Sequence, residues 1–307
     1  MSNGFSRMRR FLAVISRFLD LSPVLLPAVL QPVSTLASDF QSPRTAALGG
    51  AGRAGPLLND AITLNPSFAA FLKERVSAGI TYNSFAPTPD MPVAAGSAPA
   101  GAGRNYQVSL QDGRSPFFEA GVAYTQFTDG SMIHVGASRT FIQRLGFGLG
   151  AKFQMSEDRS QVISDGSLSM TGVITPEIQA ALVVDNLYQS DRAQEAGLYR
   201  EFALGTKLNV MGIVLLYLDP HYIPELPETL GRRFGYELGA EFVVLQDVFL
   251  RTGVFRDAKT AATRSYGTGW SLGAGWLGPK LSFDLGFARA VDPVPADSWT
   301  FGATLYL

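Results

Sequence analysis

From residue 75 to the last residue, apolar side chains recur at every second position in one segment after another. The clearest case is 234–244, where Phe, Tyr, Leu, Ala, Phe and Val alternate with Gly, Glu, Gly, Glu and Val. The same period of two runs through 118–125 and 281–288. Strict alternation is typical of a β-strand with one apolar and one polar face. The chain is therefore predicted to be all-β from residue 75 onward.

Fourteen segments carry this pattern, and each is predicted to be a strand. They are 75–85, 104–111, 117–127, 131–140, 146–155, 165–175, 178–188, 198–208, 210–218, 233–244, 247–256, 267–277, 280–289 and 298–307. Short turns are expected at one end, around 175–177, 245–246 and 278–279. Longer loops are expected at the other end, at 86–104, 156–164, 189–197, 219–232, 257–266 and 290–297, with one brief exception near 129–130.

Segment length and loop sorting favour a membrane barrel over a soluble sandwich. The segments run to about ten residues, the length that crosses a bilayer at a tilt, and soluble strands average about five or six. An even strand number with short turns on one side is typical of bacterial outer-membrane barrels. We therefore predict a transmembrane antiparallel β-barrel of fourteen strands at 75–307, with outer-membrane lipid around it.

The first 37 residues have the pattern of a secretory signal peptide. Arg7, Arg9 and Arg10 precede an apolar stretch, and small residues end it at Ala37. Three prolines and two charges interrupt the stretch, which argues against a membrane-spanning helix. Residues 1–37 are thus expected to direct export and to be removed.

Composition and charge narrow the function further. The chain of 307 residues has 25 basic and 26 acidic side chains and no cysteine. A near-neutral balance without a basic cluster argues against a nucleic-acid partner. The absence of cysteine excludes thiol catalysis and cysteine-ligated metal sites.

Several motifs in the mature chain resemble the long-chain fatty acid transporter (FadL) superfamily, including its shorter PorV-like members. They are Ala-Leu-Gly-Gly-Ala-Gly at 47–52, Asn-Asp-Ala at 59–61, Leu-Asn-Pro-Ser at 64–67, Thr-Pro-Glu at 175–177 and Leu-Gly-Ala-Glu-Phe at 238–242. The resemblance implies a fourteen-stranded barrel whose N-terminal segment, 38–74, is a plug or hatch.

The Asn65-Pro66 pair has two possible structural roles. It can end a short helix and set the entry to the first strand. The resemblance implies instead a movable plug element at the same place. Phe68, Phe71 and Leu72 then either pack inside the barrel base or line an apolar ligand cavity.

Inward-facing charges are the second set of candidate residues. They are Glu119, Lys152, Lys207, Glu237, Glu241, Arg251 and Asp284. If the turn near 244–248 is a tight hairpin with Val244 opposite Val248, Glu241 lies opposite Arg251. A structural ion pair is favoured over a selectivity element.

Enzyme chemistry has little support in the sequence. His134 is expected to face the lumen and His221 to lie in an outer loop, and no nucleophile or metal-binding constellation accompanies them. The stretch 50–55 matches G-x-G-x-x-G, but a cleavage site precedes it and Pro56 follows it, so no nucleotide site is expected. We expect instead a glycine-rich segment that passes through a narrow lumen, where larger side chains would clash. No enzyme activity, metal or cofactor is predicted.

Two functions remain. The barrel can be a conduit for a hydrophobic, fatty-acid-like small molecule that the N-terminal segment gates. Alternatively, it is a PorV-like accessory that binds a protein partner and transports nothing. A continuous apolar path through the lumen would favour the conduit, and a lumen filled with side chains would favour the accessory.

Overall fold

The structure is a computed structural model, and it describes residues 40–57, 59–73, 75–88, 102–115, 117–128, 130–156, 162–195, 198–226, 232–256, 267–292 and 295–307. The predicted signal peptide lies outside these ranges. Across them, every helix is too short or too polar to span a bilayer.

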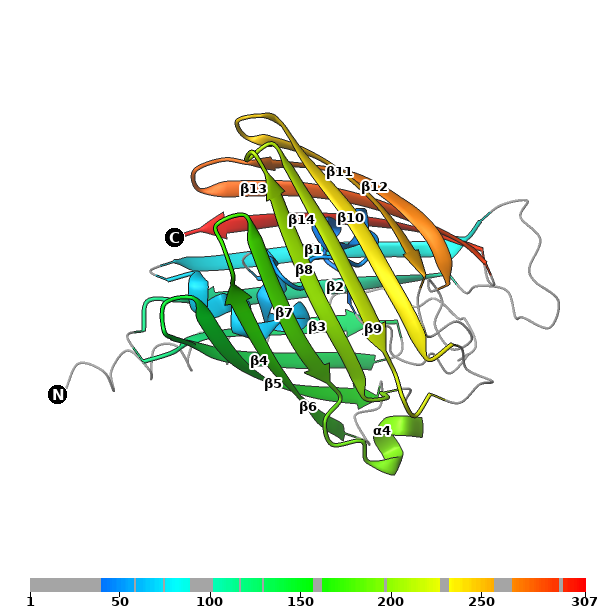
Figure 1. The fold of residues 1–307 in the computed structure, drawn as a ribbon. Helices are drawn as coiled ribbons and strands as arrows, with labels where there is room; N and C mark the ends of the chain where they lie inside the picture. Colours follow the sequence, from blue (N-terminus) through cyan, green and yellow to red (C-terminus); the bar gives the residue numbers. More distant parts are fainter. Residues whose placement is uncertain are drawn as a thin grey trace. The chain divides into compact units, whose positions relative to one another are not determined.

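Fourteen antiparallel strands close into a barrel, which confirms the predicted strand number (Figure 1). The strands are β1 Val76–Pro87, β2 Gly103–Asp112, β3 Glu119–Phe127, β4 Gly130–Phe141, β5 Leu145–Ser156, β6 Val162–Val173, β7 Ile178–Asp185, β8 Glu201–Val210, β9 Val214–Tyr222, β10 Phe234–Leu245, β11 Val248–Arg256, β12 Thr268–Leu277, β13 Leu281–Asp292 and β14 Ala296–Tyr306. Each pairs with its sequence neighbours, and β1 pairs with β14, so the sheet has no free edge.

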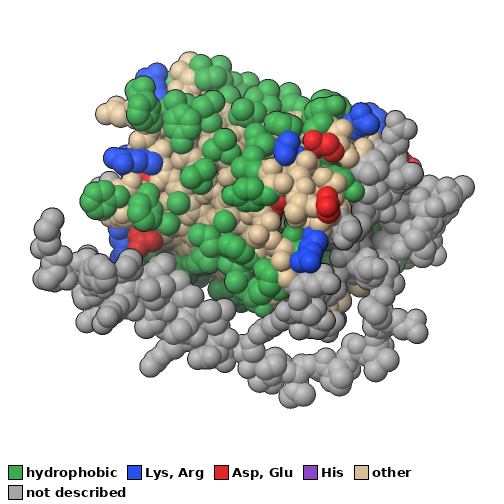
Figure 2. Space-filling model, turned by 90° about the horizontal axis from the view of Figure 1, so that it is seen from below, with side chains coloured by type: hydrophobic (Ala, Val, Ile, Leu, Met, Phe, Trp, Pro, Cys, Tyr) green, Lys and Arg blue, Asp and Glu red, His purple; other side chains and the backbone are tan. Residues whose placement is uncertain are grey.

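Polar side chains face inward and apolar ones face outward. Thr125, Thr171 and Ser271 on the inner face have no exposed surface, whereas Leu149 and Leu272 on the outer face are 64% and 50% exposed. Figure 2 shows hydrophobic side chains covering the visible wall, with charged ones near its ends. This is the reverse of a soluble barrel.

Where the structure describes them, the turns and loops follow the predicted sorting with one difference. The loops predicted at 86–104, 156–164 and 257–266 lie wholly or largely outside the described residues. Strands meet through 142–144, 174–177, 211–213, 246–247 and 278–280 at one end, and through the longer 186–200 and 223–233 at the other. We call these the short-turn end and the long-loop end. The connection predicted at 290–297 is shorter, because β13 continues to Asp292 and β14 begins at Ala296.

Strand β9 corrects the predicted place of His221. The sequence predicts a loop from residue 219, yet β9 runs on to Tyr222 and pairs Pro220 with Tyr236 of β10. Proline has no N–H to donate, and the ladder to β8 is interrupted at Asp219 and Pro220. His221 is therefore a buried residue of the inner face, 3% exposed, and not a loop residue.

The N-terminal segment, residues 40–73, contains three short helices. They are α2 Pro43–Ala47, α3 Asp60–Leu64 and the 3-10 helix η1 Pro66–Phe71. Figure 1 shows this segment in blue, surrounded by the strands. A fourth helix, α4 Asp191–Glu195, lies in the loop between β7 and β8.

Candidate functional site

Helix α2 is tied to the wall by a buried chain of alternating charges. Arg44 donates to Glu241 through Nε at 3.1 Å, and Arg251 donates to the same carboxylate at 2.6 Å. Arg251 also donates to Asp284 at 2.5 Å. Burial alone would lower the pKa of Arg44, but the Glu241 carboxylate raises it above its ordinary value. Arg44 therefore stays charged and bound to β10.

Glu241 and Arg251 lie opposite each other on the inner face, as the sequence predicts. The hairpin that sets this register differs from the expected one. Val243 pairs with Phe249 and Leu245 with Val248, with an irregularity at Val244 between them. One extra residue on β10 is accommodated at this irregularity. Glu241 and Arg251 are therefore paired as predicted, although the turn that joins their strands is not the predicted one.

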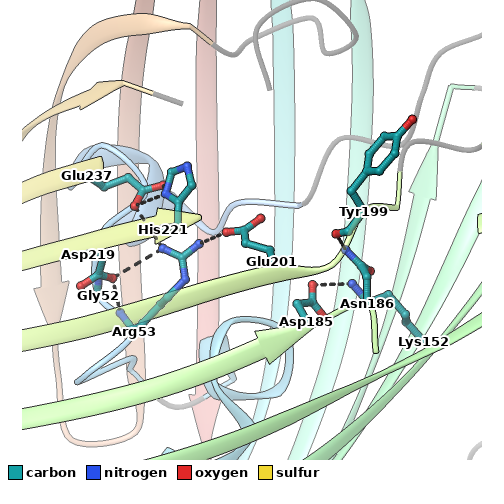
Figure 3. A network of polar contacts seen from close by, with 10 residues as sticks. All are labelled: Gly52, Arg53, Lys152, Asp185, Asn186, Tyr199, Glu201, Asp219, His221 and Glu237. Carbon is teal, nitrogen blue, oxygen red and sulfur yellow. Dashed lines mark hydrogen bonds and ion pairs between the residues drawn. The ribbon is translucent and has the colours of Figure 1, made fainter. Parts of the chain in front are cut away.

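Arg53 is the centre of a second polar cluster (Figure 3). Its guanidinium lies 3.2 Å from both Glu201 of β8 and Glu237 of β10. The backbone N–H groups of Gly52 and Arg53 each donate to Asp219 of β9 at 2.8 Å. These contacts fix the middle of the N-terminal segment to three consecutive strands.

His221 joins this cluster from the next inward-facing position of β9 after Asp219. Its Nδ1 lies 3.2 Å from Glu237 Oε2. Farther along the wall, Lys152 of β5 pairs with Asp185 of β7 at 2.5 Å. Figure 3 shows both groups near the long-loop ends of their strands.

Two asparagines hold the third part of the segment. Asn59 donates to Ser109 of β2 at 2.8 Å and accepts from Ser77 of β1. Asn65 donates to the Arg53 carbonyl at 2.6 Å and to Thr171 of β6 at 2.7 Å. Together with Arg44 and Arg53, they spread the anchors around the barrel.

Asn65 and Pro66 end one helix and begin the next. Asn65 follows the last residue of α3, and its side-chain oxygen accepts from the Ser67 N–H at 3.1 Å, which caps η1. Phe68 and Phe71 pack against each other with ring centroids 5.8 Å apart, and Leu72 ends η1. None of these three lines the two cavities described next.

Two interior cavities lie beside the N-terminal segment. The larger, about 90 Å³, is lined by ionisable side chains that include Arg53, His134, Lys152, Glu201 and His221. The smaller, about 50 Å³, is lined by residues of the short-turn end, among them Phe249, Trp276 and Tyr306. Both are too small for a ligand of the usual pocket size of about 300 Å³ or more.

Ser42 and Asp60 line both cavities and so form part of the partition between them. Ser42 donates to Asp60 at 2.8 Å. Burial raises the pKa of Asp60 to about 6, against the opposing effects of Arg44 and of the Ser42 hydrogen bond. The partition therefore contains a carboxyl group that titrates close to neutral pH.

The predicted inward charges all lie on the inner face of their strands. Glu119, Lys152, Glu237, Glu241 and Arg251 are buried, and Lys207 and Asp284 are half-buried. The structure brings Glu237 into the Arg53 cluster and Glu241, Arg251 and Asp284 into the Arg44 chain. Glu119, Lys152 and Lys207 are in neither.

The sequence pattern does not single out Arg44, Arg53, Glu201 or Asp219. The sequence nevertheless contains a signal for these ion pairs. Arg44 and Arg53 are the basic residues between positions 40 and 60, and the inward-facing positions of β8 to β10 are rich in Asp and Glu. A basic segment inside an acidic wall would have indicated these pairs.

The glycines at 49–55 have a packing role. Gly52 has φ of +130°, which side-chain-bearing residues rarely adopt. On the wall, a Cβ at Gly253 would lie 2.3 Å from the Leu48 carbonyl carbon. Segment and wall are therefore in backbone contact.

Within the described residues there is no group of three or more His, Asp or Glu side chains placed to bind a metal.

The arrangement of fourteen strands around an N-terminal segment has counterparts among solved structures. The CymD monoaromatic hydrocarbon channel matches with a TM-score of 0.61 at 13% identity over 86% of this chain and 96% of its own. The Ralstonia pickettii toluene transporter TbuX has a TM-score of 0.60 at 11% identity, covering 87% of this chain and 98% of its own. A Pseudomonas aeruginosa FadL homologue has a TM-score of 0.59 at 11% identity, with 86% and 97% covered. The fold is FadL-like.

No protein-family model matches the sequence, and no curated protein matches it. The FadL-like relation is thus one of fold, over nearly the whole length of the structures compared.

Proposed function

We propose that this chain is an outer-membrane barrel that conducts small hydrophobic molecules, and that its N-terminal segment is a plug that closes the lumen. The observation that carries the proposal is the FadL-like fold, shared over 86–87% of the chain with a hydrocarbon channel and a toluene transporter. The apolar outer face suits a lipid environment. The proposal involves no enzymatic reaction.

The contacts of residues 40–73 support the plug. Arg44, Arg53, Asn59 and Asn65 bind different parts of the wall, and the two cavities described beside the segment are small. A molecule of toluene size can then pass only if part of the segment moves. The described conformation is the closed one in this proposal.

Because the chain has no cysteine, a disulfide can test the plug directly. A Cβ built on Gly136 of β4 lies 3.5 Å from Pro66 Cβ, within the range of disulfide geometry. We expect Pro66→Cys with Gly136→Cys to conduct when reduced and not when oxidised. Uptake of labelled toluene by intact bacteria that display the chain is the measurement, with each single variant as a control.

The two parts of the proposal fail separately in this experiment. Equal uptake by the oxidised and reduced double variant would refute gating by the N-terminal segment. Uptake by the reduced protein no greater than that of bacteria without the chain would refute the conduit.

One observation favours the PorV-like accessory. The inner face is lined with polar and charged side chains, and both cavities beside the segment are small, the larger one bounded mostly by such groups. Native mass spectrometry of the chain from its own membrane separates the two functions. A stoichiometric protein partner and no small molecule would support the accessory.

A further inference from the structure

A shallow, wide-open hollow lies on the outer face of the barrel over β11 to β14 and β1. Its lining is almost wholly apolar. Ala274 and Ala303 are its small residues, and Ile80, Trp276, Phe283 and Phe301 also line it.

The hollow exists because small residues replace large ones in an otherwise bulky surface. Across the sheet, Ala303 lies between Phe283 and Ile80, and Ala274 is opposite Leu285. In a bilayer such a depression is filled by lipid chains, because an empty one would forfeit the dispersion contacts of its walls.

An aromatic pair marks the level of the hollow in the wall. Trp276 and Phe283 stack with ring centroids 6.1 Å apart, close to the turn at 278–280. Aromatic residues gather where the hydrocarbon meets the headgroups. The hollow therefore lies just inside the hydrocarbon at the short-turn end.

Two exposed basic side chains lie at the rim beside the hollow. Lys280 precedes β13 and is three residues from Phe283, roughly 10 Å along the strand. Arg75 precedes β1. The end of β14 lies between them, because the Tyr306 N–H donates to the Lys280 carbonyl and the Leu307 N–H to Val76. Neither Lys280 nor Arg75 forms an ion pair with any described carboxylate.

The same rim also carries negative charge. Asp247 lies in the adjoining turn, where its carbonyl accepts from the Leu277 N–H. The rim as a whole is therefore not strongly basic. Recognition at Lys280 and Arg75 has to act on a local anionic group, not on the net charge of a ligand.

We propose that this hollow and rim form a phospholipid-binding site, with an acyl chain in the hollow and the phosphate at Lys280 and Arg75. The site rests on the proposed membrane location and is independent of conduction through the lumen. It would seat one lipid of the bilayer leaflet at the short-turn end.

The test uses the full barrel in mild detergent, with phosphatidylglycerol and diacylglycerol of the same acyl chains as probes in native mass spectrometry. We expect the phospholipid to bind more tightly than diacylglycerol. Lys280→Gln with Arg75→Gln should weaken phospholipid binding about fivefold per charge removed and leave diacylglycerol unchanged. Arg144→Gln, in the exposed turn between β4 and β5, is the matched control.

A second variant tests the hollow. Ala303→Phe fills it and should weaken both probes, whereas Ala180→Phe on the outer face of β7, between exposed Ile178 and Leu182, should weaken neither. Equal binding of the two probes to the unmodified chain would overturn the site. So would a double variant or Ala303→Phe that binds phosphatidylglycerol as the unmodified chain does. Toluene uptake is unaffected by these results, so the conduit stands or falls on its own test.

Discussion

At the scale of single residues, charge pairing inside the barrel is what holds the N-terminal segment. Arg44, Glu241 and Arg251 have side chains no more than 4% exposed. A buried charge is expensive to desolvate, and it is tolerated when opposite charges and hydrogen bonds surround it. Removing one member leaves the others without compensation, so these residues are sensitive points.

Arg251→Glu tests this pairing. The new carboxylate would face Glu241 and Asp284, and we expect a loss of about 3–5 kcal/mol in the free energy of unfolding. Urea unfolding followed by tryptophan fluorescence measures it. Arg114→Glu, in an exposed turn with its side chain 63% exposed, should change the midpoint little. An unchanged midpoint for Arg251→Glu would contradict the buried pair.

Asp60 predicts a pH dependence. Its pKa is about 6 in the folded chain and ordinarily 3.8, so the folded state favours the protonated form. The stability from Asp60 is complete below about pH 4 and is lost as pH rises through 6. Asp60→Asn should remove up to about 3 kcal/mol of this decline. Urea midpoints of both proteins across this range measure it, and parallel curves would argue against the shift.

At the scale of elements, the strands were predictable and the contacts between segment and wall were not. A period of two identifies each strand locally, because alternation is a property of neighbouring residues. The anchor of Arg44 on Glu241 joins residues 197 apart, and no local pattern carries that information. The position of His221 in β9 was unpredictable for the same reason, because the strand continues past Pro220 only through its pairing with β10.

Close backbone packing of α2 against β11 gives a prediction for an element. Gly253→Val places a side chain where Leu48 now lies, and overpacking of this kind costs about 1–3 kcal/mol. We expect the N-terminal segment to loosen while the barrel stays closed. Trypsin cleavage after Arg44 or Arg53 should become about tenfold faster.

Gly172→Ala is the control for this change, because the nearest atom to its new Cβ is 3.9 Å away. Cleavage at an unchanged rate in Gly253→Val would mean that α2 does not depend on this contact.

At the scale of the whole molecule, the barrel is apolar outside and polar inside. Alternation, strand length and turn sorting were sufficient to predict this architecture. The sequence did not predict whether the lumen is open or filled with side chains, because both alternatives place the same residue types on the inner face. Which cavities remain depends on packing of the N-terminal segment against all sides of the wall.

The proposed membrane location predicts that the outer face is sensitive to charge according to depth. Leu272, in the middle of β12 and 50% exposed, should lose about 2–4 kcal/mol of stability when changed to Arg. Leu245, at the end of β10, should lose about 1 kcal/mol or less. Unfolding from lipid vesicles measures both, and equal small effects would argue against a lipid-facing wall.

The pairing of β1 with β14 also sets an order of events in biogenesis. Ser77 and Tyr306 become partners only after all the residues between them have been synthesised. Until then both outermost strands are unpaired, and such strands are prone to join other chains. Residues 40–73 also bind strands that lie far apart in the sequence, from Ser77 of β1 to Ser271 of β12, so their contacts are complete only after β12 has been made. Assembly therefore depends on keeping an open sheet apart from its neighbours until β14 arrives.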